Sequence, residues 1–242
     1  AHAPEARLVK RRDLAMIAVQ GPGARARAWQ ALPQLREAGE PLARFEAAQA
    51  GPVLVARTGY TGEDGVEIML PAPEAEDAWR KLLAAGVAPA GPGARDTLRL
   101  EAGMNLYGMD MDETVTPLES GLAWTVELDT PRAFFGKDAL LARPATRRLA
   151  GLVLTDRGVM RSGQDVRCAA GSGRLTSGGY SPTLNRSIGL ARLPGAVTDG
   201  ATVEVRVRDR WLRARAVKPP FVRNGRILVD VSADAPAAGR PG

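Results

Sequence analysis

Cysteine and histidine are almost absent from this chain of 242 residues. Cys168 is the only cysteine, so the chain can form no internal disulfide and no cysteine cluster for a metal. His2 is the only histidine, which excludes Ser-His and Cys-His catalysis and any site with two histidine ligands. We therefore expect no metal, and acid–base chemistry falls to carboxylates, to Lys137 or to a tyrosine.

Long apolar runs are missing as well. No stretch approaches the length of a membrane span, and the N-terminus has no apolar signal core. The apolar fraction of 45% and the charged fraction of 25% are typical of a globular protein. The sequence predicts a cytoplasmic protein with no membrane partner. It begins at Ala1 rather than at an initiator methionine, so a longer chain is an open alternative.

The positive charge is concentrated in one part of the chain. Residues 1–146 hold 16 Lys and Arg against 20 Asp and Glu, whereas residues 147–226 hold 16 against 5, a net charge of +11. This excess suggests an acidic partner, and we expect that partner not to be a nucleic acid. Codon bias is the alternative, since 29 of the 33 basic residues are arginine. The candidate docking residues are Arg206, Arg208, Arg210, Arg213 and Arg215.

Residues 1–145 combine short apolar runs with helical periodicity, which predicts an α+β domain. Strands are expected at residues 13–20, 53–56 and 66–70, and helices at residues 24–32, 73–85, 94–104 and 136–143. In the third strand, Val66, Ile68 and Leu70 share one face, and Glu67 and Met69 share the other. The expected apolar face of helix 73–85 consists of Ala75, Ala78, Trp79, Leu82 and Leu83.

A second domain is expected after Pro144, where glycines separate short β-rich runs. These runs are LAGLVLT (149–155), GRLTSGGY (173–180), SIGLARL (187–193), ATVEVRVRD (201–209) and WLRARAV (211–217). The spacing of these runs predicts a small antiparallel barrel or sandwich over residues 146–226. Residues 227–242 are expected to form a last strand and a disordered tail.

Glu67 is the most informative candidate for a binding residue. A carboxylate on a strand can simply face solvent, or it can turn into a pocket and accept two parallel hydrogen bonds from a guanidinium or a pterin ring edge. The preceding loop, residues 58–65, has three glycines but lacks the Gly-Lys-Ser/Thr ending of a phosphate loop. A tight hairpin with glycines at positive φ is the expected structure of this loop.

Helix 94–104 and the segment after it supply two more candidates. Arg95, Asp96, Arg99 and Glu101 can form surface salt bridges, or Arg95 can bind an anionic or carbonyl group of a ligand. Trp124 can be a core residue or a wall for a flat ring.

Several motifs together strongly resemble the T protein of the glycine cleavage system, an aminomethyltransferase. They are RTGYTGEDGVEI (57–68), GARDTLRLEAGMNLYG (93–108), MDET (111–114), PL (117–118) and WT (124–125). Further similar segments are DLAMIAVQGP (13–22), FGKDAL (135–140), LTSG (175–178), SPTL (181–184) and KPPFV (218–222). The resemblance covers nearly the whole chain.

The resemblance implies a function and a set of site residues. That family transfers a methylene group from aminomethyl-lipoyl H protein to tetrahydrofolate and releases ammonia. Glu67 is then expected to hold the pterin and Arg95 to contact the folate, with Tyr60 and Trp124 as further pocket residues. The implied partners are tetrahydrofolate and lipoylated H protein.

The chain departs from the family at its start. Family members carry roughly another third of a chain before the segment resembling residues 13–22, and that part holds the catalytic aspartate. Residues 1–145 are thus expected to be a partial folate-binding domain, and no catalytic residue is assigned. Two alternatives remain open: the folate domain of a sarcosine or dimethylglycine oxidase, and a folate- or partner-binding module without catalysis.

Overall fold

The structure is a computed structural model that describes residues 5–230. It contains two compact units, residues 1–91 and 92–242, and each is described by itself. The predicted domain boundaries after residues 145 and 226 stay predictions. His2 and the expected tail from residue 231 onward lie outside the described residues.

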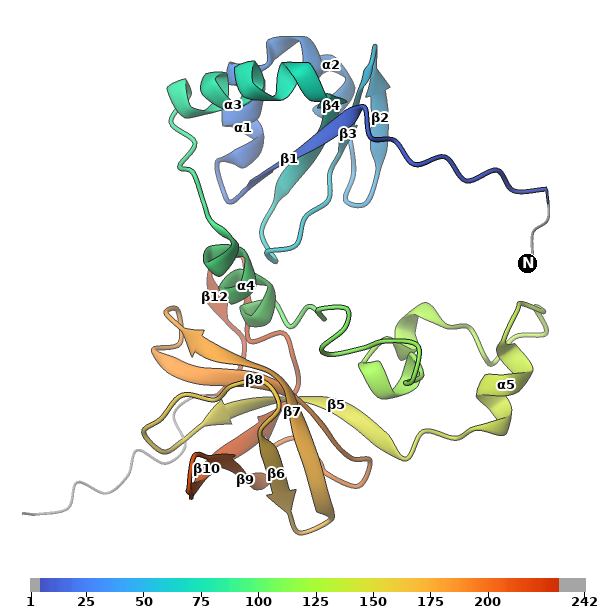
Figure 1. Ribbon diagram of the computed structural model, residues 1–242, viewed down its shortest axis with the longest axis vertical. Coiled ribbons are helices and arrows are strands. Elements are labelled where there is room, and N and C mark those ends of the chain that lie inside the picture. The colour runs from blue at the N-terminus through green and yellow to red at the C-terminus, as the bar shows by residue number, and fades with distance from the viewer. Residues whose placement is uncertain (1–4, 231–242) are drawn as a thin grey trace, which may run out of the picture. The chain divides into compact units, whose positions relative to one another are not determined.

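The first unit is a four-stranded antiparallel sheet in the order β1-β4-β3-β2. Its strands are β1 (Leu14–Gln20), β2 (Ala47–Ala50), β3 (Val53–Ala56) and β4 (Gly65–Pro71). Its helical segments are α1 (Ala24–Ala31), η1 (Pro33–Leu35), α2 (Arg36–Gly39), η2 (Ala72–Glu74) and α3 (Ala75–Ala84). Helices α1 and α3 lie together on one side of the sheet (Figure 1), and no helix formed by residues 5–91 covers the opposite face.

The core of the first unit confirms the predicted face of β4. Val66, Ile68 and Leu70 are buried and pack in one cluster with residues of α1 and α3. The expected apolar face of α3 is wrong for two residues, because Trp79 and Leu83 are 43% and 41% exposed. Each follows a buried residue, Ala78 or Leu82, and successive residues of a helix point about 100° apart, so Trp79 and Leu83 face solvent.

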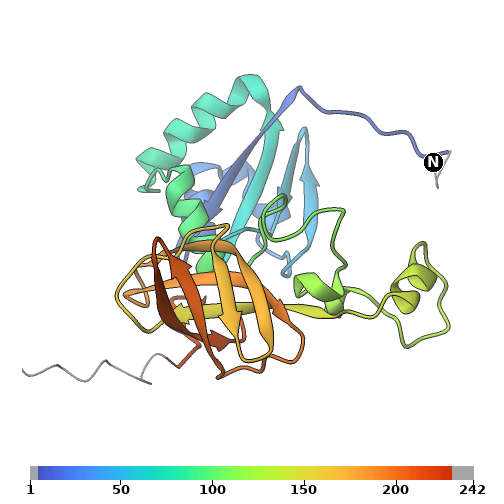
Figure 2. The same cartoon turned by 60° about the horizontal axis from the view of Figure 1, so that its bottom comes forward.

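The second unit confirms a barrel and not a sandwich. Six antiparallel strands close in the order β10-β5-β8-β7-β6-β9 (Figure 2). They are β5 (Arg147–Leu154), β6 (Asp165–Cys168), β7 (Gly171–Ser181), β8 (Arg186–Pro194), β9 (Thr202–Val207) and β10 (Arg210–Val217). The other elements are α4 (Pro92–Glu101), η3 (Leu118–Ser120), η4 (Ala123–Thr125), α5 (Lys137–Ala142), β11 (Val222–Arg223) and β12 (Arg226–Ile227).

The strands β2 and β6 were not predicted. Each has only four residues, and β2 reads AAQA, with no β-branched or aromatic side chain. Both strands form through pairing with longer or more apolar neighbours, β2 with β3 and β6 with β7 and β9. Local sequence alone therefore carries little signal for them.

Helix α4 packs on the outside of the barrel. Its Leu100 belongs to a buried cluster with Ile188 and Phe221. The expected salt bridge between Asp96 and Arg99 forms, at 2.8 Å, but the expectation of a surface position is wrong for Arg99, which is 3% exposed and also lies 3.0 Å from the fully buried Asp110. It is also wrong for Glu101, whose buried carboxylate accepts hydrogen bonds from Ser181 and Thr183 and makes no ion pair within residues 5–230.

Candidate functional site

Glu67 stands in the middle of β4, on the face of the sheet opposite the helices. Its direct cross-strand neighbours are Ala18 in β1 and Ala56 in β3. Directly opposed residues in antiparallel strands share a face, so two methyl groups flank the carboxylate. Because alanine side chains are too short to cover the carboxylate, Glu67 is only half-buried.

The next row of the same face is apolar. Met69 lies two residues beyond Glu67 and pairs with Met16 in β1 and Leu54 in β3. Met16 is 61% exposed, which is unusual for an apolar side chain in the middle of a strand. One carboxylate thus stands beside an apolar shelf, an arrangement that suits a flat ring with N–H donors along one edge.

The loop from Arg57 to Asp64 supplies the only hydrogen bond to the Glu67 side chain within the described residues. Thr58 Oγ1 donates this bond to Glu67 Oε2. Motif analysis did not single out Thr58 as a site residue. Thr58 and Glu67 are nine residues apart, a spacing that predicts no contact. The contact forms only because the loop folds back over β4.

Gln20, at the end of β1, fastens this loop to the sheet. Its Nε2 donates to the carbonyl of Thr58 at 3.0 Å and to that of Val66 at 3.4 Å. Its Oε1 accepts from Thr61 Oγ1 at 3.1 Å. A Cβ at Gly59 would overlap the Gln20 amide, so this glycine allows a close approach.

The expected role of the loop glycines is only partly right. Gly62 has a positive φ of 75°, as expected, whereas Gly59 and Gly65 do not have a positive φ. At Gly65 a Cβ would collide with the carbonyl of Val19, so this glycine too is required for space. The glycines therefore serve the packing of the loop against β1 as much as the turn itself.

An ion pair closes the base of the loop. Arg57 Nε and Nη2 each lie 3.0 Å from an oxygen of the Asp64 carboxylate, a bidentate arrangement. Arg57 Nη1 also donates to the carbonyl of Leu42 at 2.9 Å. The hydrogen bonds from Arg57 hold the pKa of Asp64 below its usual value, against a smaller opposing effect of desolvation.

The four expected folate-binding residues fall in both units. Tyr60 is half-buried in the same loop as Thr58, so the first unit holds Tyr60 and Glu67. The second unit holds Arg95, exposed on α4, and Trp124 in η4. Trp124 is 82% exposed, so the alternative that it is a core residue is wrong. The four roles themselves stay predictions.

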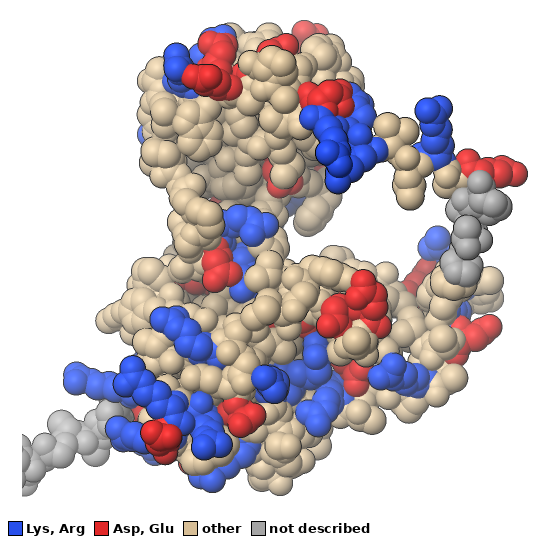
Figure 3. All heavy atoms as spheres, in the orientation of Figure 1, with Lys and Arg blue, Asp and Glu red and all other residues tan. Residues whose placement is uncertain are grey.

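The candidate docking arginines lie on the hairpin of β9 and β10. Arg206 pairs across the strands with Trp211, Arg208 and Arg210 lie at the turn, and Arg213 is 3.2 Å from Asp156. Figure 3 shows basic side chains gathered over one side of the barrel, with few acidic ones among them. The outward side chains of the hairpin form a largely positive surface.

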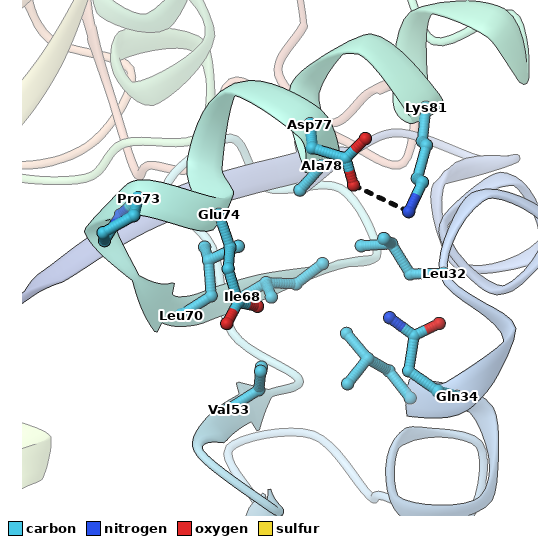
Figure 4. A pocket seen from close by; sticks show the side chains of 11 residues that line it. Leu32, Gln34, Val53, Ile68, Leu70, Pro73, Glu74, Asp77, Ala78 and Lys81 are labelled. Atoms are coloured by element: carbon cyan, nitrogen blue, oxygen red, sulfur yellow. Dashed lines mark ion pairs between the residues drawn. The ribbon is translucent and has the colours of Figure 1, made fainter.

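A cavity of about 350 Å³ lies on the helix-covered side of the first unit. Its floor includes Ile68 and Leu70, and its rim carries the side chains of Gln34 and Glu74 (Figure 4). None of the expected site residues lines it. Because its floor faces the opposite way from Glu67 across β4, it is separate from the candidate site.

The part of the chain from residue 5 to residue 230 contains no helix long and apolar enough to cross a membrane. Within the same residues, no three His, Cys, Asp or Glu side chains come together in a way that could hold a metal. The expected absence of a metal stays a prediction.

Two protein-family models match the chain. Residues 2–130 match the GCVT N-terminal domain, and residues 147–223 match the glycine cleavage T-protein C-terminal barrel domain. The barrel domain model thus covers all six strands of the barrel.

Relatives and a solved structure agree with these matches. Over 232 residues the chain is 60% identical to an aminomethyltransferase of Nitrosomonas eutropha, covering 94% of this chain and 64% of the relative. An aminomethyltransferase of Bordetella pertussis is 58% identical, with 91% and 61% covered. The crystal structure of glycine cleavage system aminomethyltransferase T from Bartonella henselae is 30% identical, with a TM-score of 0.76, and the match covers 87% of this chain and 60% of that one. The chain therefore spans less than two thirds of the length of these relatives.

The Arg57–Asp64 pair predicts a pH-dependent coupling. A depressed carboxyl pKa adds stability that is present above the unfolded value, near 3.9, and is lost as the pH falls through the folded value. In a double-mutant cycle with Arg57→Gln and Asp64→Asn, we expect a small but measurable coupling at pH 7, since the pair is partly exposed.

Urea unfolding at several pH values measures this coupling. It should be constant above about pH 5 and fall towards zero below about pH 4. A coupling of the same size at pH 3 and at pH 7 would show that the charge on Asp64 does not matter.

Proposed function

The chain belongs to the glycine cleavage T-protein family, and from this we propose that it is the folate-binding and barrel part of an aminomethyltransferase. In the proposed reaction, the methylene group of aminomethyl-lipoyl H protein passes to tetrahydrofolate, and ammonia and reduced lipoyl H protein are released. The proposed setting is cytoplasmic glycine catabolism. Relatives at 58–60% identity carry the name aminomethyltransferase, which favours this function over an oxidase of sarcosine or dimethylglycine.

The position of Glu67 is the observation that carries the proposal. The pterin of tetrahydrofolate presents adjacent N–H donors along one edge, and an ionised carboxylate only accepts hydrogen bonds. The exposed Ala18 leaves space for a flat ring on the β1 side of this carboxylate. Met16 and Met69 offer polarisable side chains for the ring to lie against.

The other site residues have supporting roles in the proposal. Tyr60 shares the Arg57–Asp64 loop with Thr58 and contributes to the pocket wall. Arg95, exposed on α4, binds an anionic or carbonyl group of folate, and Trp124 offers a flat apolar surface.

The proposed reaction requires a catalytic carboxylate, and we assign that role to no residue of this chain. Loss of ammonia and attack by folate N5 on the same carbon need proton transfer and charge stabilisation, to which a placed carboxylate contributes about 10²–10⁴ in rate. Among the acids of α4, Asp96 pairs with Arg99 and Glu101 is held by Ser181 and Thr183. We therefore place the catalytic aspartate in the part of the relatives that the match does not cover.

The hairpin of β9 and β10 is the proposed docking surface for the acidic lipoyl carrier. Arg206, Arg208 and Arg210 are exposed, and no acidic residue within 4.0 Å pairs with them in the described chain. Long-range attraction of this kind raises the rate of encounter more than it strengthens the complex.

Substitution of Glu67 tests the folate site. The suitable protein is this chain joined to the part of the Nitrosomonas eutropha relative that the match leaves out, called here the extended chain. Glu67→Ala should weaken tetrahydrofolate binding by roughly 30-fold or more, about 2–5 kcal/mol, because a charged contact loses its partner. Glu74→Ala, on the rim of the separate cavity, is the matched control and should change the dissociation constant less than twofold. A change under about threefold for Glu67→Ala contradicts the proposal.

Comparison of the extended chain with the chain of 242 residues tests the catalytic part of the proposal. We expect the shorter chain to form no methylenetetrahydrofolate from aminomethylated H protein, and the extended chain to form it. Substitution of the supplied aspartate by asparagine should then lower the rate about 10²–10⁴-fold. Equal turnover by both chains would mean that a carboxylate within this chain performs the step.

Charge reversal on the barrel tests the docking surface. The double variant Arg206→Glu/Arg210→Glu should slow association with H protein at about 20 mM salt and have much less effect at 500 mM, where the Debye length is only a few ångström. Arg12→Glu/Arg44→Glu changes the net charge equally at exposed positions of the first unit and serves as the control. Equal association rates for both double variants at every salt concentration would favour codon bias as the explanation of the arginine excess and would contradict the docking surface.

A further inference from the structure

We propose that Thr58 is a positioning residue for Glu67. Its hydroxyl fixes one oxygen of the carboxylate so that the other oxygen is presented to the ligand at the open face of the sheet. The inference rests on the proposed folate site, and it concerns a residue that does not itself touch the reacting atoms.

The contacts of Glu67 assign the two oxygens different roles. Oε2 accepts the hydrogen bond from Thr58 Oγ1, and no other residue in the range 5–230 bonds to this side chain. The neighbouring Ala18 and Ala56 have no polar atoms beyond the backbone. A glutamate side chain has three rotatable bonds, so without the Thr58 hydroxyl no hydrogen bond from residues 5–91 would select one orientation of the carboxylate.

Thr58 can act in this way because its own backbone is held. The Gln20 amide donates to the Thr58 carbonyl at 3.0 Å and accepts from the hydroxyl of Thr61 at 3.1 Å. Gly59 closes against the same amide, where a Cβ would not fit. The chain of contacts therefore runs from β1 through Gln20 to Thr58 and then to the carboxylate on β4.

The direction of the Thr58 bond also limits what Glu67 can bind. A threonine hydroxyl has a single proton, and here the proton is donated to the carboxylate. Oε1 then has both lone pairs available and Oε2 has one, which matches a ligand edge with two adjacent N–H donors. The Thr58 hydrogen bond pre-organises the Glu67 carboxylate as an acceptor and so lowers the entropic cost of ordering it when the ligand binds.

The test compares Thr58→Val, which removes the hydroxyl at nearly constant volume, with Thr58→Ser, which keeps it. Tetrahydrofolate is titrated calorimetrically into the extended chain and its variants. We expect Thr58→Val to weaken binding about 10-fold and Thr58→Ser less than about threefold. In turnover with H protein, the KM for tetrahydrofolate should rise in Thr58→Val while kcat stays within about threefold.

A double-mutant cycle separates positioning from a general structural role. Thr58→Val should have no further effect on the dissociation constant in a Glu67→Ala background, since the hydroxyl then has nothing to position. Thermal unfolding of each variant is measured in parallel. Should Thr58→Val lower the unfolding temperature by more than a few degrees, Thr58→Ala provides a second variant without the hydroxyl.

The outcomes distinguish the inference from the proposed function. If Glu67→Ala loses binding while Thr58→Val binds like the unsubstituted chain, the positioning role is wrong and the folate site stands. Equal losses in Thr58→Val and Thr58→Ser, or equal effects of Thr58→Val with and without Glu67, also overturn the inference. If the unsubstituted extended chain does not bind tetrahydrofolate, the proposed function itself fails.

Discussion

The amide of Gln20 is the constraint on which the candidate site depends. It lies at the end of β1 and bonds to backbone or side-chain groups of Thr58, Thr61 and Val66. A partly buried amide of this kind is costly to leave unpaired, so its contacts with Thr58 and Thr61 hold the loop against the sheet. The loop in turn carries the hydroxyl that bonds to Glu67. A local packing requirement at β1 thereby determines the geometry of a carboxylate on another strand.

The second unit shows a different use of polar groups. Asp110 is fully buried and accepts hydrogen bonds from Arg99 at 3.0 Å, Thr176 at 2.5 Å and Ser177 at 2.7 Å. This network joins α4 and the segment after it to strand β7 of the barrel. Removal of one partner from such a network leaves a buried charge uncompensated. Arg95 belongs to the same helix, so the network also holds its backbone in place on the barrel.

The sequence predicted the features that depend on a local residue pattern. It missed the features that depend on contacts between segments far apart in the chain. Alternation in residues 66–70 gave the buried face of β4 and the outward position of Glu67 correctly. Charge spacing in 95–101 allowed surface salt bridges, and Asp96 does pair with Arg99, but Arg99 and Glu101 are buried because further partners come from distant segments. The roles of Gln20 and Thr58 carried no local signal, since their contacts join residues up to 46 positions apart. Family resemblance supplied the proposed folate-binding role of Glu67, which spacing alone left open between a surface acid and a ligand.

The central claim is that folate binds on the open face of the four-stranded sheet. Methyl NMR of the extended chain, labelled at methionine, alanine and leucine and titrated with tetrahydrofolate under reducing conditions, tests it most directly. Binding on the open face should cause saturable shifts at Met16, Met69 and Ala18, with no shift at the methyls of Leu32 and Leu35 beside the cavity on the helix-covered side. Shifts confined to the cavity methyls, with an unchanged open face, would contradict it.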